Sequence, residues 1–198
     1  DGSFSVNNLL EGRVDVLARV LTNSLFVSNG VRKSTSVTLL LSEQLLSITI
    51  DGSKIKGCNP DEKSWGLKLQ AAVKNEMNEG TEQVVVHGNC NGICVKRDQT
   101  LAKLLSSYEN RGDELFVCVE DAAKQFWTVL PLSSSSSSSS SSTSKTTTTL
   151  ILGDNSGFND EEMKTLGHLQ KVNFGPTSLL ASSVVTLAHH YLDEVEMN

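Results

Sequence analysis

Residues 150–158 read LILGDNSGF, and residues 171–193 read KVNFGPTSLLASSVVTLAHHYLD. The first stretch is an apolar run that stops at Gly153, which predicts a strand followed by a turn. The second predicts a short strand, a Gly-Pro turn and an apolar helix over residues 178–192. Ligands of open α/β sheets bind at the carboxyl ends of strands, where glycine lets the backbone approach closely. Because an ordinary turn is the commoner explanation of a strand followed by Gly-Asp, this pattern alone identifies no ligand site.

Strands and helices alternate along most of the chain. Some segments carry apolar residues at helical spacing, whereas others are short, β-branched and bounded by turn signals. Such alternation predicts an α/β fold in which helices cover both faces of a sheet. The first helix is expected to end near the Asn29-Gly30 pair, a helix C-cap signal. The predicted helices span residues 14–25, 62–78 and 100–108, and the predicted strands span residues 37–41, 45–50, 83–86, 92–95, 115–120 and 126–130.

The length and apolar content of the chain bound the number of domains. With 198 residues, of which 38% are apolar, one domain with a substantial core is expected. Residues 133–149 consist of serine and threonine apart from one lysine and cannot bury apolar surface, so they predict a flexible, solvated loop. Because strand-like segments flank this loop, we interpret it as part of a single domain over residues 1–198. A linker between two domains is the alternative.

Composition excludes several classes of protein. No window approaches the roughly 18 apolar residues of a membrane span, and no signal-peptide pattern opens the sequence, which predicts a cytoplasmic protein without a membrane partner. The four cysteines form no CxxC pair, which argues against a zinc site and a disulfide framework, and no metal is expected. The net charge of −6 gives no global attraction for nucleic acid, so an RNA partner would need a local basic patch.

The two stretches quoted first are similar to the C-terminal signature of the TrmY family. These archaeal enzymes of the SPOUT class methylate N1 of a pseudouridine in the T loop of tRNA. Other matches follow in order along the chain, so the resemblance covers nearly all of it. GRVDVLAR at residues 12–19 resembles Gly-Arg-Leu-Asp-Leu-Leu-x-Arg, Arg32-Lys33 matches two basic residues, NPDE at 59–62 resembles Ser-Pro-Asp-Glu, and GICVKR at 92–97 resembles Gly-Ile-x-Val-Arg-Arg.

The resemblance implies a SPOUT-type α/β fold with a C-terminal trefoil knot, a homodimer, and S-adenosyl-L-methionine as cofactor. The sequence departs from the family pattern in three places, since Asn155 stands where the family has histidine, Val184 where it has cysteine, and Ser182-Ser183 where Asn-His is common. The cofactor is expected to be held largely by main-chain groups, because this part of the sequence is poor in charge. The cofactor-binding residues implied by position are Leu130, Gly153, Val172, Asn173, Phe174, Gly175, Pro176, Leu179 and Val184.

The resemblance also implies catalytic roles for Arg13 and Asp15. Methylation at N1 of pseudouridine requires this nitrogen to lose its proton, and the developing negative charge must be stabilised. Arg13 could stabilise that charge or bind a phosphate, and Asp15 could accept the proton or a hydrogen bond. A surface ion pair at the start of a helix is the alternative. The residues expected to contact RNA are Arg19, Arg32, Lys33, Lys96, Arg97 and Asn155, and a solvated charged face is the alternative for the five cations.

Two other functions remain open at this point. One is methylation of a pseudouridine in rRNA by an enzyme of the small-subunit assembly type, which shares the knot and the chemistry. The other is a catalytically degenerate knot that binds RNA or protein, which the departures at Asn155 and Val184 would permit. The prediction that we carry forward is an S-adenosylmethionine-dependent RNA methyltransferase whose most favoured substrate is tRNA.

Overall fold

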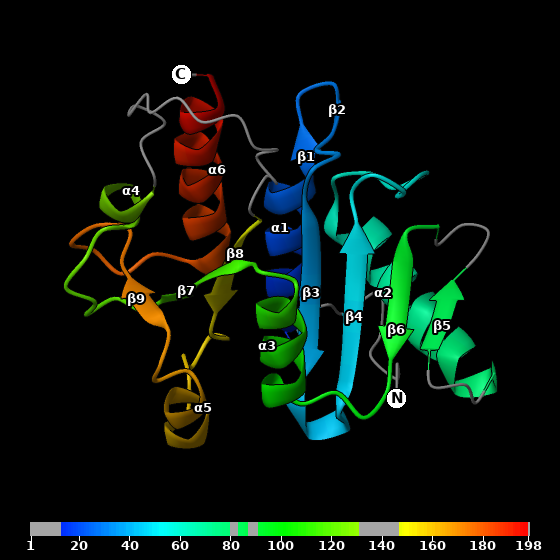
Figure 1. The fold of residues 1–198 in the computed structure, drawn as a ribbon. Helices are drawn as coiled ribbons and strands as arrows, with labels where there is room; N and C mark the ends of the chain where they lie inside the picture. Colours follow the sequence, from blue (N-terminus) through cyan, green and yellow to red (C-terminus); the bar gives the residue numbers. More distant parts are fainter. Residues whose placement is uncertain (1–12, 80–82, 87–90, 131–146, 198) are drawn as a thin grey trace, which may run out of the picture. The chain divides into compact units, whose positions relative to one another are not determined.

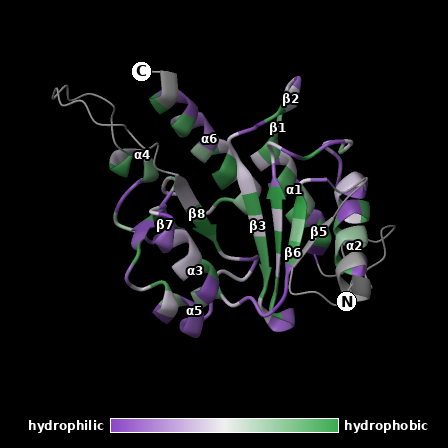
Figure 2. Cartoon of the chain, turned by 45° about the vertical axis from the view of Figure 1, so that its right-hand side comes forward, coloured by the Kyte–Doolittle hydropathy of each residue, from purple (hydrophilic) through white to green (hydrophobic). Residues whose placement is uncertain are grey.

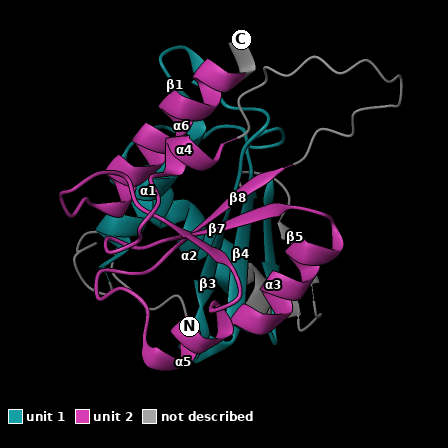
Figure 3. Ribbon diagram, turned by 60° about the vertical axis from the view of Figure 1, so that its left-hand side comes forward, with its two compact units in different colours: residues 1–100 teal, residues 101–198 magenta. Residues whose placement is uncertain are grey.

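The computed structural model describes residues 13–79, 83–86, 91–130 and 147–197. These residues belong to two units, one of residues 1–100 and one of residues 101–198 (Figure 3). Both units combine helices with strands, so the predicted α/β class is confirmed (Figure 1). The single domain over residues 1–198 stays a prediction, and most of the serine- and threonine-rich loop lies outside the described residues. In the described part of the chain, no helix is long and apolar enough to cross a membrane.

The first unit is built on a four-stranded antiparallel sheet with the strand order β3-β4-β6-β5. A two-stranded hairpin, β1 with β2, precedes it. The predicted pair of strands near residues 37–50 and the predicted second helix are confirmed. The elements are α1 (Val14–Leu25), β1 (Phe26–Val27), β2 (Gly30–Val31), β3 (Ser36–Leu41), the 3-10 helix η2 (Ser42–Gln44), β4 (Leu46–Asp51), α2 (Glu62–Glu79), β5 (Gln83–Val86) and β6 (Ile93–Lys96).

Helices α1 and α2 pack into the hydrophobic core of the first unit. Ala18, Leu21 and Leu25 recur at helical spacing and are fully buried, together with Trp65 of α2. The indole N–H of Trp65 donates to the hydroxyl of Thr22 at 3.0 Å, which satisfies the polar end of a buried aromatic side chain. Figure 2 shows the apolar residues concentrated along β3 and β6. This packing fixes the course of α1, which carries the predicted catalytic residues.

The second unit is built on a three-stranded parallel sheet with the strand order β8-β7-β9. The described strands therefore form separate hydrogen-bonded sheets, whereas the sequence predicted one. Strand β8 begins at Thr148, so the last two residues of the predicted loop 133–149 belong to a strand. The elements are α3 (Leu101–Asn110), β7 (Glu114–Cys118), α4 (Phe126–Val129), β8 (Thr148–Leu152), α5 (Asp160–Thr165), β9 (Gln170–Val172) and α6 (Ala181–Met197).

Apolar clusters cover both faces of the parallel sheet. Neighbouring residues of a strand point to opposite faces, and Phe116 and Val117 of β7 belong to different clusters. The cluster around Phe116 includes residues of α4 and α6, among them Ala188. The cluster around Val117 includes Leu105 of α3 and Leu166 at the end of α5. Coverage of both faces, as predicted from the alternation of strands and helices, is confirmed for this sheet.

The prediction of a strand over residues 126–130 was wrong, because this segment forms the short helix α4 and a following turn. Phe126 and Leu130 are both buried in the same cluster, and a spacing of four residues puts two side chains on one side of a helix. The backbone N–H of Thr128 donates to the carbonyl of Gln125 at 3.0 Å, which closes the turn. Tertiary packing here overrides the strand preference of aromatic and β-branched residues.

The predicted span of the first helix, residues 14–25, is confirmed, but the cap expected near Asn29-Gly30 is wrong. Helix α1 stops at Leu25, and the next residues pair in a hairpin in which Phe26 faces Val31 and Val27 faces Gly30. Asn29 therefore lies in the two-residue connection of this hairpin, and Gly30, interpreted with it as a helix cap, begins β2. Asn-Gly is also a signal for tight hairpins, and the apolar, β-prone residues before it favour that outcome.

Gly52, which follows β4, provides a test of this architecture. A Cβ at Gly52 would lie 2.7 Å from the carbonyl oxygen of Thr35 and would also collide with the carbonyl oxygen of Arg32, so the backbone must shift. We expect Gly52→Ala to lower the free energy of unfolding by about 1–3 kcal/mol, the usual cost of overpacking. Gly30→Ala is the matched control, because a Cβ there meets no atom within 4 Å. Urea unfolding followed by circular dichroism measures both, and equal midpoints would contradict the close packing.

Candidate functional site

The predicted cofactor-binding residues lie in the second unit, and the predicted catalytic pair lies in the first. In the second unit, the three parallel strands end level with one another, because Cys118 of β7 pairs with Leu152 of β8 and with Val172 of β9. The residues that follow, Gly153 and Asn173, therefore lie at the same edge of the sheet, on either side of β7. This is the carboxyl edge, where ligands bind in parallel α/β sheets.

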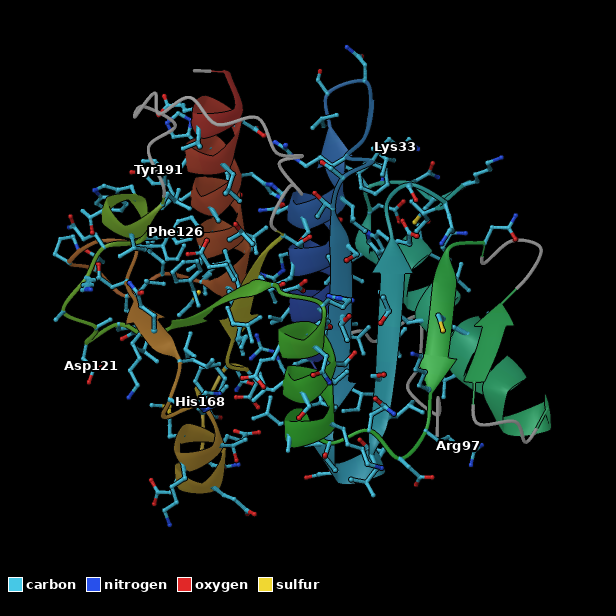
Figure 4. The ribbon with its side chains drawn as sticks, in the orientation of Figure 1. Lys33, Arg97, Asp121, Phe126, His168 and Tyr191 are labelled. Carbon is cyan, nitrogen blue, oxygen red and sulfur yellow. The ribbon has the colours of Figure 1, made fainter. Side chains whose placement is uncertain are left out.

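An apolar cluster contains five of the nine predicted cofactor-binding residues. Phe174 stacks on Phe126, with ring centroids 5.0 Å apart, and Trp127 stacks on Tyr191 of α6 at 4.8 Å. Figure 4 labels Phe126 and Tyr191 on α4 and α6. The structure thus joins residues from α4, β9 and α6 that are far apart in the sequence. The predicted residues in this cluster are Leu130, Val172 and Phe174, which are buried, and Leu179 and Val184, which are partly buried.

Asn173 ties the loop after β9 to the loop after β7. Its backbone N–H donates to the carbonyl of Lys124 at 2.9 Å, and its carbonyl accepts from the N–H of Phe126 at 2.9 Å. Its side-chain amide donates to the carbonyl of Ala122 at 2.6 Å and accepts from the N–H of Gly175 at 3.0 Å. Because its backbone N–H is used within the protein, Asn173 serves this site by holding two loops in register.

The turn after β8 explains the glycine at position 153. A Cβ there would lie 2.7 Å from the backbone carbon of Gly157, and Asp154 forms an isolated bridge with that same glycine. The side chain of Asp154 also accepts from the backbone N–H of Ser156 at 2.6 Å. The tight turn alone therefore requires glycine at 153. Asn155 is exposed in this turn.

The segment after β9 suits a ligand that is recognised by main-chain groups. Residues 172–180 contain no charged side chain. Gly175 adopts a φ of 125°, which favours glycine, and Pro176 beside it is exposed. Adenosine is uncharged and its adenine base is planar, so it fits an apolar cluster with main-chain donors and acceptors at its edge. These residues are therefore chemically compatible with S-adenosylmethionine.

The cysteines indicate no covalent or metal chemistry in the described part of the chain. Cys58, Cys94 and Cys118 are free thiols there, and Cys90 lies outside it. Burial raises the pKa of the Cys118 thiol to about 12, so this side chain at the end of β7 is protonated and a poor nucleophile at neutral pH. Within the same described ranges, no three His, Cys, Asp or Glu side chains are arranged to hold a metal ion.

In the first unit, Asp15 lies between two arginines at the start of α1. Its side chain is 4% exposed, and it accepts a hydrogen bond from Nε of Arg13 at 3.3 Å. Nη2 of Arg19, one helical turn further, pairs with the other carboxylate oxygen. Nε of Arg19 also lies 3.3 Å from Glu62 at the start of α2. Arg19 thus links the buried carboxylate to the next helix, a role that the sequence did not indicate, because Glu62 is far from α1 in the chain.

The charge state of Asp15 follows from these neighbours. Burial by itself raises the pKa of this carboxyl, but the hydrogen bond from Arg13 and the charges of Arg13 and Arg19 outweigh that effect and lower it. Asp15 is therefore a stable carboxylate at neutral pH and a weak proton acceptor. Arg13 itself is 53% exposed, so it is the accessible member of the pair.

Arg13 also has an uncommon backbone conformation. It occupies the N-cap position of α1 with φ of 55° and ψ of 34°, in the left-handed region. A non-glycine residue there costs on the order of 1–3 kcal/mol, and such strain concentrates at functional sites. The buried Asp15 holds the Arg13 side chain on one side of this bend. The predicted pair is thus a fixed arrangement in which the carboxylate orients the guanidinium.

The other predicted RNA-binding cations do not form one patch. Figure 4 shows Lys33 and Arg97 at opposite ends of the four-stranded sheet. Lys96, next to Arg97, pairs with the start of β4, whereas Nζ of Lys33 donates to the carbonyl of Gly52, just past the end of β4, at 3.3 Å. The Arg32-Lys33 pair and the Lys96-Arg97 pair are therefore separated by the length of the strands.

Comparison with known proteins shows what the chain as a whole is similar to. Residues 1–197 match a family model described as "Putative SAM-dependent RNA methyltransferase". The tRNA (pseudouridine(54)-N(1))-methyltransferase of Methanosarcina acetivorans is 31% identical over 202 residues, which cover 98% of this chain and 86% of that protein. The enzyme of the same name from Haloarcula marismortui is 28% identical over 194 residues, covering 96% of this chain and 88% of that protein.

A solved structure has a similar fold. Nep1 of Archaeoglobus fulgidus, bound to S-adenosylhomocysteine, superposes with a TM-score of 0.63 at 15% sequence identity. The match covers 94% of this chain and 73% of that chain. At this low identity the similarity concerns the fold alone. The α/β architecture of this chain resembles that of Nep1.

The lowered pKa of Asp15 predicts a dependence of stability on pH. A carboxyl whose pKa is lower in the folded state stabilises the fold above its unfolded value of about 3.9, and this contribution is lost as the pH falls through the folded pKa. We expect the free energy of unfolding to fall more steeply below about pH 5 in the parent protein than in Asp15→Asn. Urea unfolding at a series of pH values from 7 to 3 measures this difference.

Asp121→Asn is the control for that experiment, because it removes one negative charge at an exposed position of the second unit. Its stability profile should follow that of the parent protein. Parallel profiles of the parent and Asp15→Asn would show that the two arginines do not stabilise the Asp15 carboxylate in solution.

Proposed function

This chain belongs to a family of S-adenosylmethionine-dependent RNA methyltransferases, and we propose that it methylates N1 of pseudouridine 54 in tRNA. The relatives described above are named for that activity and align with nearly the whole chain. The observation that carries the proposal is the shared carboxyl edge of β8, β7 and β9, which gathers predicted cofactor-binding residues above an apolar cluster. Ligands of parallel α/β sheets bind at this edge.

We assign cofactor binding to the carboxyl edge of the parallel sheet. Bound S-adenosylmethionine supplies a methyl group activated by a positively charged sulfur. Leu130, Val172 and Phe174 provide buried apolar surface for the adenosine, with Leu179 and Val184 at its margin. Gly153 and the turn at residues 173–176 bring main-chain atoms to the same edge, and Asn173 keeps that turn in place. The residues of this chain thus bind and orient the cofactor and exclude water from it.

We assign the nucleobase to Arg13. N1 of pseudouridine carries a proton that must leave before or during methyl transfer, and the developing negative charge needs a fixed cation. Arg13 is exposed, and Asp15 holds it from the buried side. A guanidinium in this position also has donors for two acceptors at once, which suits a planar base or a phosphate.

The structure favours a positioning role for Asp15 over a role as proton acceptor. Its carboxylate is buried, its pKa is lowered, and both oxygens contact arginines. A base could reach it only after Arg13 moved. Arg19, which pairs with Asp15 and Glu62, belongs to the same positioning network. The cations that we assign to RNA phosphates are Arg32, Lys33, Lys96 and Arg97, and Asn155 in the turn after β8 is a further candidate RNA contact.

The trefoil knot, the homodimer and a cytoplasmic location form the finer part of the proposal. The knot and the homodimer follow from the family resemblance, and a cytoplasmic location suits an enzyme that acts on tRNA. In support of a dimer, Leu180 before α6 is 69% exposed although it is a large apolar residue. Several apolar residues of α6 are only partly buried within the second unit. An isologous interface would cover such a surface without another partner.

Methyl transfer to defined RNAs tests the activity. We expect a tRNA transcript with pseudouridine at position 54 to gain N1-methylpseudouridine in the presence of S-adenosylmethionine, as measured by mass spectrometry of nucleosides. A transcript with uridine there should gain none, because N1 of uridine bears the ribose. Arg13→Ala should lower kcat/KM by about 100-fold or more, the usual cost of removing one electrostatic donor.

Arg111→Ala is the matched control. Arg111 pairs with Asp113 two residues later, and the exposed fractions of these two side chains, 56% and 4%, nearly equal those of Arg13 and Asp15.

Methylation of rRNA but not of tRNA would support the alternative of small-subunit assembly. Absence of transfer to any RNA, with S-adenosylhomocysteine raising the melting temperature by mass action, would indicate a binding module that lost catalysis.

The dimer makes a separate prediction. Light scattering at micromolar concentration should give twice the chain mass of 21.4 kDa. Leu180→Asp should raise the dimer dissociation constant at least about tenfold, because burying a leucine side chain contributes about 1.5–3 kcal/mol. Leu67→Asp, at a leucine of α2 that is 51% exposed, should leave the mass unchanged. A monomeric parent protein would contradict the dimer.

A further inference from the structure

The net negative charge of the chain comes entirely from its second half. Residues 1–100 contain eleven Lys and Arg and eleven Asp and Glu, whereas residues 101–198 contain six and twelve. A polyanion such as RNA is therefore opposed by net charge only in the second half. Cations clustered in residues 1–100 would therefore attract the phosphates of an RNA without an opposing net charge from that half.

Basic residues from three segments converge on the turn at residues 51–56, which follows β4. Lys54 and Lys56 belong to this 51–56 turn, and both are exposed. Nζ of Lys33 donates to the carbonyl of Gly52 at 3.3 Å, and Nζ of Lys68 donates to the carbonyl of Lys56 at 3.4 Å. The turn itself holds one carboxylate, that of Asp51, which lies 2.8 Å from Nζ of Lys54. Cations thus outnumber carboxylates at this turn.

The backbone of the 51–56 turn is fixed by close packing on two sides. Gly52 lies against the backbone of Arg32 and Thr35, and its N–H donates to the carbonyl of Thr35 at 3.0 Å. On the other side, a Cβ at Gly92 would lie 2.6 Å from the backbone nitrogen of Ile55. The side chain of Ile55 is 3% exposed and belongs to the core of the first unit. A buried anchor thus separates two exposed lysines.

Such an arrangement suits the binding of phosphates. Neighbouring cations repel one another, and an anionic ligand that neutralises them relieves this repulsion. A lysine on a fixed backbone loses less conformational freedom on binding than one on a flexible loop. The side chain of Lys68 is buried, so Lys68 supports the turn through its contact with the backbone. Lys33, Lys54 and Lys56 are exposed, so a ligand can reach them.

We propose that Lys33, Lys54 and Lys56 at the 51–56 turn bind phosphates of the substrate RNA at a distance from the reacting base. This rests on the proposed function, which it deepens by adding Lys54 and Lys56 to the RNA contacts. The N–H of Arg32 donates to the carbonyl of Leu25 at 2.8 Å, which joins the turn region to the carboxyl end of α1. Arg13 caps the opposite end, so about 18 Å of helix at 1.5 Å per residue separates the two. The turn therefore contacts the RNA several nucleotides from the base at Arg13.

Salt dependence of RNA binding tests the proposal. Fluorescence anisotropy of a labelled tRNA transcript gives the binding constant at several KCl concentrations. Each true phosphate contact contributes roughly 0.7–0.9 to the slope of log K against log salt. Lys54→Gln and Lys56→Gln should each lower the slope by about that amount and weaken binding. Lys164→Gln, at an exposed lysine of α5, is the control and should leave slope and affinity unchanged.

A variant that is expected to bind RNA more tightly distinguishes the loss of a phosphate contact from misfolding. Asp51→Asn removes the carboxylate of the turn but keeps an Oδ1 acceptor for the N–H of Ser53, which Asp51 binds at 2.9 Å. This variant should bind the tRNA transcript more tightly than the parent protein. A general loss of folding would weaken binding in all variants, and circular dichroism spectra that match the parent's establish that each variant is folded.

The outcomes separate this proposal from the proposed function. Unchanged slopes in Lys54→Gln and Lys56→Gln, in a parent protein that binds and methylates tRNA, would overturn the phosphate site and leave the activity intact. Reduced slopes in a parent protein that methylates no RNA would support the site and contradict the activity. If binding to phosphatidylglycerol vesicles depended on the two lysines and binding to tRNA did not, the assignment of this site to RNA would be overturned.

Discussion

The parallel pairing of β7 with both β8 and β9 is the constraint on which the second unit depends. Parallel neighbours cannot be joined by a tight turn, so each connection must cross a face of the sheet. These connections contain α4 and α5, and the clusters beneath them cover the two faces. Because the strands end level, Gly153 and Asn173 lie roughly 10 Å apart across β7, two strand spacings. The candidate cofactor site is thus a consequence of strand register.

Much of the fold could be predicted from the sequence, because apolar periodicity records which residues are buried. The predicted segments near α1, α2, β3 and β4 match the structure closely. The errors at residues 126–130 and at the Asn29-Gly30 pair have a common origin. Both segments are short, and their local preference is ambiguous between a turn, a strand and a helix end. Contacts such as the burial of Phe126 against Phe174 decided the outcome, and those depend on residues distant in the sequence.

The candidate sites were less accessible to sequence reasoning, because burial changes the chemistry of a residue. Arg13 and Asp15 stand two residues apart, and their order does not indicate which one is exposed. The structure buries the carboxylate and exposes the guanidinium, which suits the role expected for Arg13 but favours a positioning role for Asp15 over that of a proton acceptor. The link from Arg19 to Glu62, and the convergence of Lys33 on Gly52, join segments that only the tertiary fold brings together.

Net charge describes the whole chain, whereas binding depends on the charges near one surface. The value of −6 argued against a general attraction for RNA, and that argument holds for residues 101–198. At physiological ionic strength, charges farther apart than about 8 Å are largely screened from one another. A phosphate near Lys33 therefore responds mainly to the cations and the single carboxylate of the 51–56 turn. An acidic chain can then bind an acidic polymer, provided that packing such as that of Ile55 and Gly52 holds its cations in one place.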